Sequence, residues 1–111
     1  SQSSIFDQTE VEALAEQVVG YINEENFDGL KDMSVEDMSS IMNKERMDEA
    51  KARVSEDWGE FKDIKDITTT EVTQRGVTAA VAYVSAEYEN AEIHFTFAFN
   101  EDMKLASFGI Q

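Results

Sequence analysis

The sequence contains no cysteine and only one histidine. Without cysteine the chain has no disulfide, no thiolate nucleophile and no cysteine zinc site. One histidine supplies too few nitrogen ligands for a typical transition-metal site. Gly76 and Gly109 each stand alone, so they form no phosphate-binding loop. We therefore predict a domain without metal or other cofactors.

Positive charge is also scarce, because 9 Lys and Arg stand against 24 Asp and Glu, for a net charge of −15. The cations are scattered among acidic residues, so no basic surface for nucleic-acid phosphates is expected. An anionic membrane surface would repel the chain for the same reason. No apolar run approaches the length of a membrane span, so we predict no membrane insertion by this segment.

The composition, with 41% hydrophobic and 30% charged residues, is typical of a globular protein. No Pro/Gly/Ser-rich stretch divides the chain, so a single domain over residues 1–111 is predicted, with 1–8 as a flexible terminus. The chain begins with Ser-Gln-Ser-Ser rather than methionine. We interpret this as a mature or trimmed terminus whose targeting segment, if one existed, is missing.

Apolar spacing of three and four residues predicts helices in the first half of the chain. A first helix is expected over about 9–23, with capping residues at Asp7 or Thr9. Short helical segments follow at 27–33 and 35–42. A longer helix is expected over about 44–57, capped by Asn43 and ended by a left-handed Gly59. Its predicted buried stripe comprises Met47, Ala50, Val54 and Trp58.

After Gly59 the pattern changes to β-branched and alternating residues. An extended segment at 61–72, a turn at Gln74–Gly76 and strands at 77–88, 93–99 and 104–110 are predicted. The fold class is therefore α+β, with N-terminal helices packed on an antiparallel sheet of about four strands.

The central hairpin has a register that the sequence predicts. A loop of two or four residues around Asn90-Ala91 pairs Tyr88 with Ile93, Ala86 with Phe95, Val84 with Phe97 and Ala82 with Phe99. Each phenylalanine then lies opposite a small or branched residue, as a close-packed core layer prefers. The other face pairs Glu87 with His94, Ser85 with Thr96 and Tyr83 with Ala98.

The single histidine is the first candidate for chemistry. His94 opposite Glu87, with Ser85 or Thr96 nearby, imitates a hydroxyl–histidine–carboxylate triad. No nucleophile elbow or glycine-rich oxyanion loop accompanies it, so a plain cross-strand pair is favoured and no catalytic residue is assigned. The acidic clusters, such as Glu24-Glu25, lack the alternating spacing of a calcium loop, so no metal site is predicted.

A cavity between helices and sheet is the second candidate. Aromatic residues with a polar end and flexible methionines are suited to a ligand-shaped wall, although a structural core is their commoner role. The candidate ligand-binding residues are Tyr21, Met38, Met42, Trp58, Tyr88 and Phe97.

Three segments carry a resemblance to a known family: residues 15–30, the "WGEF" at 58–61, and residues 88–110. With their order of elements, the chain resembles the nuclear transport factor 2-like superfamily, whose curved, cystatin-like sheet wraps helices on its concave face. Within it, the chain is similar to a bacterial domain family of unknown function found in secreted or lipid-anchored Gram-positive proteins. Met103 stands where relatives place glycine in the last hairpin turn, so a different turn is expected there.

The leading functional hypothesis is a non-catalytic, extracytoplasmic domain that binds a small apolar ligand, a peptide or a protein partner. A small cone-type enzyme of the isomerase or cyclase kind is the alternative, with Tyr21, Tyr88 or a buried carboxylate as its acid. A structural dimerisation module is the third possibility. The outer sheet face, where Tyr83 lies beside Val81 and Ala98, is the surface expected to form a homodimer.

Overall fold

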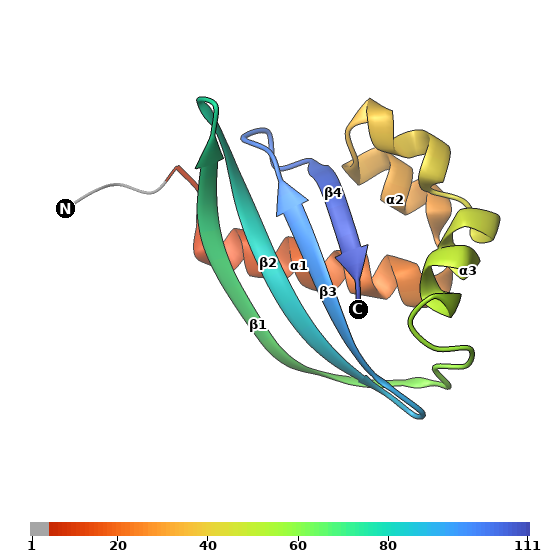
Figure 1. Ribbon diagram of the computed structural model, residues 1–111. Coiled ribbons are helices and arrows are strands. Elements are labelled where there is room, and N and C mark those ends of the chain that lie inside the picture. The colour runs from red at the N-terminus through yellow and green to blue at the C-terminus, as the bar shows by residue number, and fades with distance from the viewer. Residues whose placement is uncertain (1–4) are drawn as a thin grey trace.

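A computed structural model describes residues 5–111 (Figure 1). Its elements are α1 (Gln8–Glu24), α2 (Phe27–Met33), a 3-10 helix η1 (Glu36–Ile41), α3 (Lys44–Ala52), β1 (Phe61–Gln74), β2 (Val77–Tyr88), β3 (Glu92–Phe99) and β4 (Leu105–Ile110). Within the described residues the strands form one antiparallel sheet in the order β1-β2-β3-β4. In Figure 1, α1 crosses the concave face of this curved sheet, and the other helices lie beyond β4. The α+β prediction is confirmed.

Helix α1 forms where its apolar stripe predicts. The side chain of Asp7 accepts hydrogen bonds from the backbone N–H groups of Thr9 and Glu10 and so caps the first turn. Glu25 adopts a left-handed conformation and ends the helix. The residues buried against the sheet are Val11, Ala15, Val18, Val19 and Ile22. Of the predicted flexible terminus, residues 1–4 lie outside the described residues, and Phe6 is buried in the core.

Helix α3 is shorter than predicted. Asn43 caps it as expected, since its side-chain oxygen accepts from the Arg46 N–H at 2.9 Å. The helix ends at Ala52 rather than near residue 57, and Val54 is exposed instead of buried. The Lys51 carbonyl accepts the Trp58 indole N–H at 3.3 Å, in addition to the backbone N–H groups of Val54 and Ser55. The chain therefore turns back over the last turn of the helix to bury this ring.

The predicted register of the central hairpin is wrong by two residues. Phe95 lies opposite Val84, Phe97 opposite Ala82 and Phe99 opposite Ala80. The turn consists of Glu89 and Asn90 instead of the predicted loop around Asn90-Ala91, and it is closed by a hydrogen bond from the Tyr88 N–H to the Ala91 carbonyl at 2.8 Å. A shift of two positions keeps every side chain on its predicted face, so the three phenylalanines are buried as expected.

The turn before β4 keeps the left-handed conformation. Met103 has φ 62°, so the expected difference at this position is not found. The side-chain oxygen of Asn100 accepts hydrogen bonds from the N–H groups of Asp102 and Lys104, each at 3.0 Å. These two bonds stabilise the turn and offset the strain of a non-glycine residue there.

Candidate functional site

The six residues predicted to line a cavity fall into separate parts of the core. The rings of Trp58 and Tyr88 are 4.9 Å apart, and Phe95 joins them to Phe97. Met42 and Met38 are buried on the helical side. Tyr21 is half-buried on α1, where its hydroxyl accepts a hydrogen bond from Gln17. Ligand binding by this set stays a prediction.

The helical side of the interior is filled by side chains. The space bounded by Val18, Ile22, Leu30, Met42, Met47, Leu105 and Phe108 is too narrow for a water molecule. Among the described residues, no buried side-chain nitrogen or oxygen lacks a hydrogen-bond partner. The core of residues 5–111 therefore has no buried side-chain nitrogen or oxygen that needs a ligand as its hydrogen-bond partner.

Tyr88 is the titratable side chain that the core perturbs most. Its hydroxyl donates a hydrogen bond to the side-chain oxygen of Asn23, which joins β2 to α1. Burial raises the pKa of Tyr88 to about 12, and the bond to Asn23 opposes this shift. The phenol is therefore protonated at neutral pH and acts as a hydrogen-bond donor between sheet and helix.

His94 lies on the outer sheet face, opposite Ser85 and not opposite Glu87 as predicted. The Ser85 hydroxyl oxygen is 3.1 Å from His94 Nδ1, and His94 Nε2 is 3.8 Å from a Glu92 carboxylate oxygen. The three groups are in the order of a triad. However, Ser85 belongs to an interior strand whose backbone N–H groups are directed at its neighbours, so no oxyanion site is formed by this strand.

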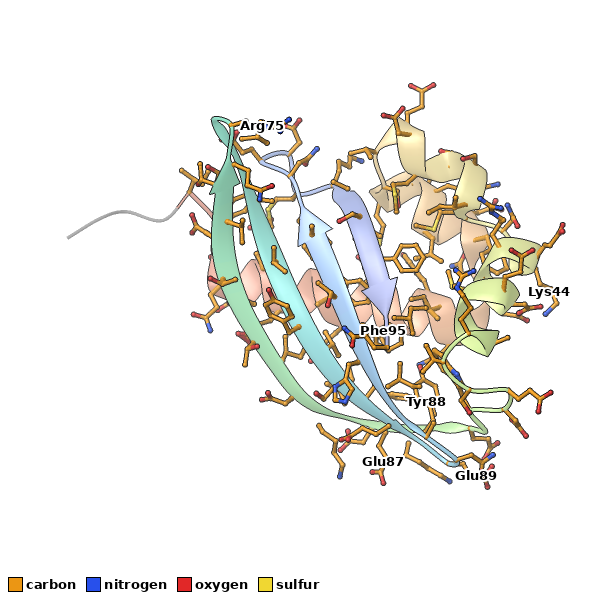
Figure 2. All side chains as sticks on the ribbon, viewed as in Figure 1. Lys44, Arg75, Glu87, Tyr88, Glu89 and Phe95 are labelled. Carbon is orange, nitrogen blue, oxygen red and sulfur yellow. The ribbon has the colours of Figure 1, made fainter. Side chains whose placement is uncertain are left out.

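The outer face of the sheet carries a patch without charge, which we name the neutral patch. Its members are Thr68, Thr70, Val72, Ala79, Val81, Tyr83, Thr96, Ala98, Ser107 and Gly109. Val81 and Ala98 lie at its centre, and Tyr83, in its last row, is 47% exposed, with Asp66 in the next row opposite Ser85. Acidic residues begin at one end of the patch, where Glu87 pairs with Lys65 at 3.2 Å. Figure 2 shows Glu87 and Arg75 at opposite ends of the sheet.

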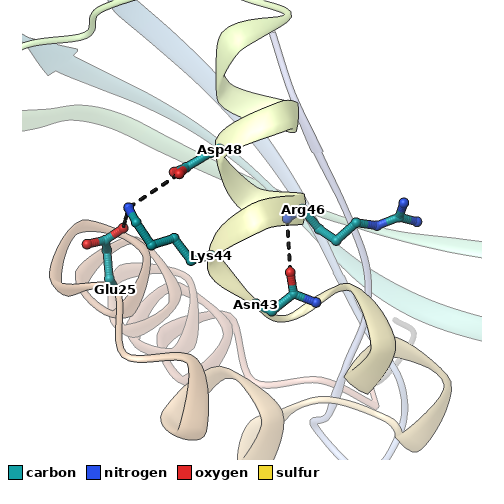
Figure 3. A network of polar contacts seen from close by, with 5 residues as sticks. All are labelled: Glu25, Asn43, Lys44, Arg46 and Asp48. Atoms are coloured by element: carbon teal, nitrogen blue, oxygen red, sulfur yellow. Dashed lines mark hydrogen bonds and ion pairs between the residues drawn. The ribbon is translucent and has the colours of Figure 1, made fainter.

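Lys44 forms the main ion-pair network among the helices (Figure 3). Its ammonium nitrogen is 2.8 Å from Glu25 and 3.3 Å from Asp48. Hydrogen bonds to Glu25 and then Asp48 raise the pKa of Lys44. All three side chains are exposed, so the network joins the end of α1 to the start of α3 without forming a binding site.

A cleft of about 300 Å³ lies between α3 and β4 and was not predicted. It is lined by Ile41, Arg46, Glu49, Ala50, Arg53, Phe108, Gly109 and Ile110. Its two arginines, seven residues apart in a chain with nine cations, are visible in the sequence, but nothing local connects them with residues 108–110. In residues 5–111, no three acidic or histidine side chains converge on a possible metal site. No helix of this range is long and apolar enough to cross a membrane.

Comparison with known proteins places the chain in a family. Residues 15–108 match the family described as "Protein of unknown function (DUF3887)". The chain belongs to the DUF3887 family. The predicted likeness to a domain family of unknown function is thereby confirmed, whereas the wider superfamily stays a prediction.

One solved structure is similar over nearly its whole length. It is an NMR structure of a protein from Ruminococcus gnavus ATCC 29149, with a TM-score of 0.79 and 22% sequence identity. The alignment covers 97% of this chain and 94% of that one. At this identity the likeness shows a shared fold alone. No curated protein matches the chain.

Proposed function

We propose that this DUF3887 domain is a non-catalytic protein-binding domain that self-associates through the neutral patch. The observation that carries the proposal is the absence of charge from this patch in a chain with 24 acidic residues. In the described part of the chain no helix covers this face (Figure 1).

The lack of charge on the patch favours a second copy of the chain as its occupant. Two molecules of net charge −15 repel one another, and contact through uncharged surfaces keeps the acidic side chains of the two copies out of the interface. The small side chains around Tyr83 form a surface that permits the close face-to-face packing of two sheets. A basic partner would instead be expected to select one of the many acidic surfaces.

The position of the acidic residues favours one arrangement of the two copies. Face-to-face packing by a two-fold axis parallel to the strands would bring the two acidic ends, with Glu87 and Glu92, together. An axis perpendicular to the strands places each acidic end against the end of the other copy that carries Arg75 (Figure 2). We therefore propose an antiparallel dimer with Val81 close to the axis.

The size of the patch limits the strength of this dimer. The patch is three to four strand spacings wide and about six residues long, which gives about 300–400 Å² per subunit, or about 600–800 Å² in total. Stable interfaces typically bury about 1,600 Å², so a reversible, weak dimer is expected. Such a contact suits domains held close together on a surface, in keeping with the extracytoplasmic location that the resemblance implies.

Two features support binding without catalysis. The interior near Met42 is filled, and Tyr88 uses its hydroxyl in a bond to Asn23. Ser85 is half-buried and His94 is exposed on the outer sheet face, so water reaches the His94 imidazole.

Sedimentation equilibrium at low and high ionic strength tests the proposal. We expect a dimer that strengthens with salt, because salt screens the repulsion between the subunits. Tyr83→Glu places a charge in the patch and should abolish the dimer. Ser40→Glu, which adds the same charge on exposed η1, is the matched control and should leave it unchanged. A monomer at both salt concentrations, up to roughly millimolar protein, would show that the patch does not self-associate.

A further inference from the structure

The cleft between α3 and β4 combines a free sheet edge with two cations. In Figure 3 the Arg46 side chain extends away from the ion pairs of Lys44. Ile41, Phe108 and Ile110 give the cleft an apolar lining. The cleft thus contains the three kinds of group that recognise a peptide strand: backbone edge, apolar surface and charge.

The backbone of β4 is open toward this cleft. His94 and Gln111 exchange both N–H···O bonds, at 2.7 and 2.8 Å, and this fixes which residues face β3. By alternation, the N–H and C=O groups of Phe108 and Ile110 point away from β3, to the free edge. Near its start the same edge already pairs with another segment, because the Val35 N–H donates to the Leu105 carbonyl at 2.9 Å. The edge beyond Leu105 is therefore suited to accept a further strand.

Both arginines lack a carboxylate partner. Within residues 5–111, neither Arg46 nor Arg53 forms a side-chain ion pair or hydrogen bond, although the chain has 24 acidic residues. Their positions seven residues apart place them on one side of the helix, about 10 Å from each other along its axis. Guanidinium groups bind carboxylates through two parallel hydrogen bonds. Glu49 lines the cleft between them and leaves a local charge of about +1.

We propose that this cleft binds an extended acidic peptide, which adds to β4 as a further strand. Its backbone would pair with Phe108 and Ile110, and alternate side chains would face α3. The peptide would carry acidic residues at positions i and i+4 and an apolar residue at i+2. In an extended strand this spacing places the two carboxylates about 13 Å apart. That separation is within reach of Arg46 and Arg53, with the apolar side chain over Ala50 between them. The site shares Gly109 with the neutral patch but differs from it in using the edge of the sheet and not its outer face.

The test uses a defined probe, the capped peptide Thr-Glu-Thr-Leu-Thr-Glu-Thr, in a titration followed by NMR spectroscopy of the isotope-labelled Tyr83→Glu protein. That background keeps any self-association out of the measurement. We expect the amide signals of Phe108 and Ile110 to shift in a saturable manner. The double variant Arg46→Glu/Arg53→Glu should weaken binding by about tenfold or more. Both side chains are exposed, so circular dichroism should show an unchanged fold.

Three controls separate strand addition from simple charge attraction. Glu49→Gln should tighten binding two- to threefold, because it removes the opposing charge. A peptide with lysine in place of glutamate should bind the double variant in preference to the parent. A peptide N-methylated at the positions that face β4 should lose binding, since it cannot donate to the edge.

The proposal would be overturned by any of three results. The first is the absence of shifts at Phe108 and Ile110 at millimolar peptide. The second is equal binding of the N-methylated peptide, which would indicate charge attraction alone. The third is a shift of these amides by sodium decanoate and not by the peptide, which would identify the cleft as a site for an anionic amphiphile.

Discussion

The two faces of strand β3 are made by the same eight residues, yet they have opposite character. Phe95, Phe97 and Phe99 are at most 1% exposed and form the centre of the core. Thr96 and Ala98, which alternate with them, are half-exposed on the outer face. The inner face has large apolar groups whose burial stabilises the fold, whereas the outer face has small groups that contribute little to it. Requirements of folding therefore explain the chemistry of one face only.

The solvent-facing side of α1 is an ordinary charged surface, of the kind that keeps a protein in solution. Its exposed positions include Glu10, Glu16 and Glu24. The outer face of the sheet is equally uncovered in the described residues but carries no charge around Val81. This difference is the reason for assigning an interaction to the sheet and not to the helix.

The largest effect on stability is expected at Phe97, on the buried face of β3. Phe97→Ala should lower the free energy of unfolding by about 3–5 kcal/mol, through lost burial and the cavity left behind. His94→Ala, on the opposite face of the same strand, should change it by less than about 0.5 kcal/mol. Chemical denaturation monitored by tryptophan fluorescence measures both. Similar values for the two variants would contradict the assignment of the faces.

The sequence predicted the faces correctly and the register incorrectly, and the reason is physical. Period-two alternation decides which side chains are buried, and a shift of two residues leaves that unchanged. The turn that sets the register is held from outside the hairpin, because Glu89 and Asn90 donate to the carbonyls of Glu60 and Trp58. A contact between segments so far apart in the chain has no local signature.

The same limit applies to α3 and to the candidate sites. The helical period continues through Val54, but α3 ends at Ala52 and the chain turns back to bury the Trp58 ring. The neutral patch could be predicted in part, since Tyr83, Val81 and Ala98 were placed on the outer face by alternation. The cleft could not, because it brings α3 against residues 108–110 through the folding of the whole chain.

A smaller effect is expected at Tyr88, which belongs to the inner face but carries a polar group. Tyr88→Phe removes the hydrogen bond to Asn23 and should cost about 1 kcal/mol at neutral pH. The raised pKa means that the folded state holds the phenol proton more tightly than the unfolded state does. The stability that this preference provides is complete below about pH 10 and is lost as the pH rises to about 12.

Ultraviolet titration of the chain's three tyrosines measures this directly. We expect one phenol to ionise near pH 12 and that step to be missing from Tyr88→Phe. Tyr83→Phe, on the exposed face, is the matched control and should leave the late step in place. If the late step disappears in Tyr83→Phe instead, the buried phenol is Tyr83 and the two faces of β2 have been assigned the wrong way round.

The smallest effect concerns the turn that joins β1 to β2 and sets which residues each face receives. Gln74 pairs with Val77, and the two turn residues have positive φ, 54° at Arg75 and 78° at Gly76. Asn-Gly is the preferred pair for such a turn, since asparagine tolerates the left-handed conformation better than arginine does. Arg75→Asn should therefore stabilise the protein by about 0.5–1 kcal/mol. Arg75→Lys keeps both the charge and the strain, so its thermal unfolding midpoint should equal that of the parent. If Arg75→Asn unfolds at the same temperature as Arg75→Lys, the strain at this turn does not limit the stability of the sheet.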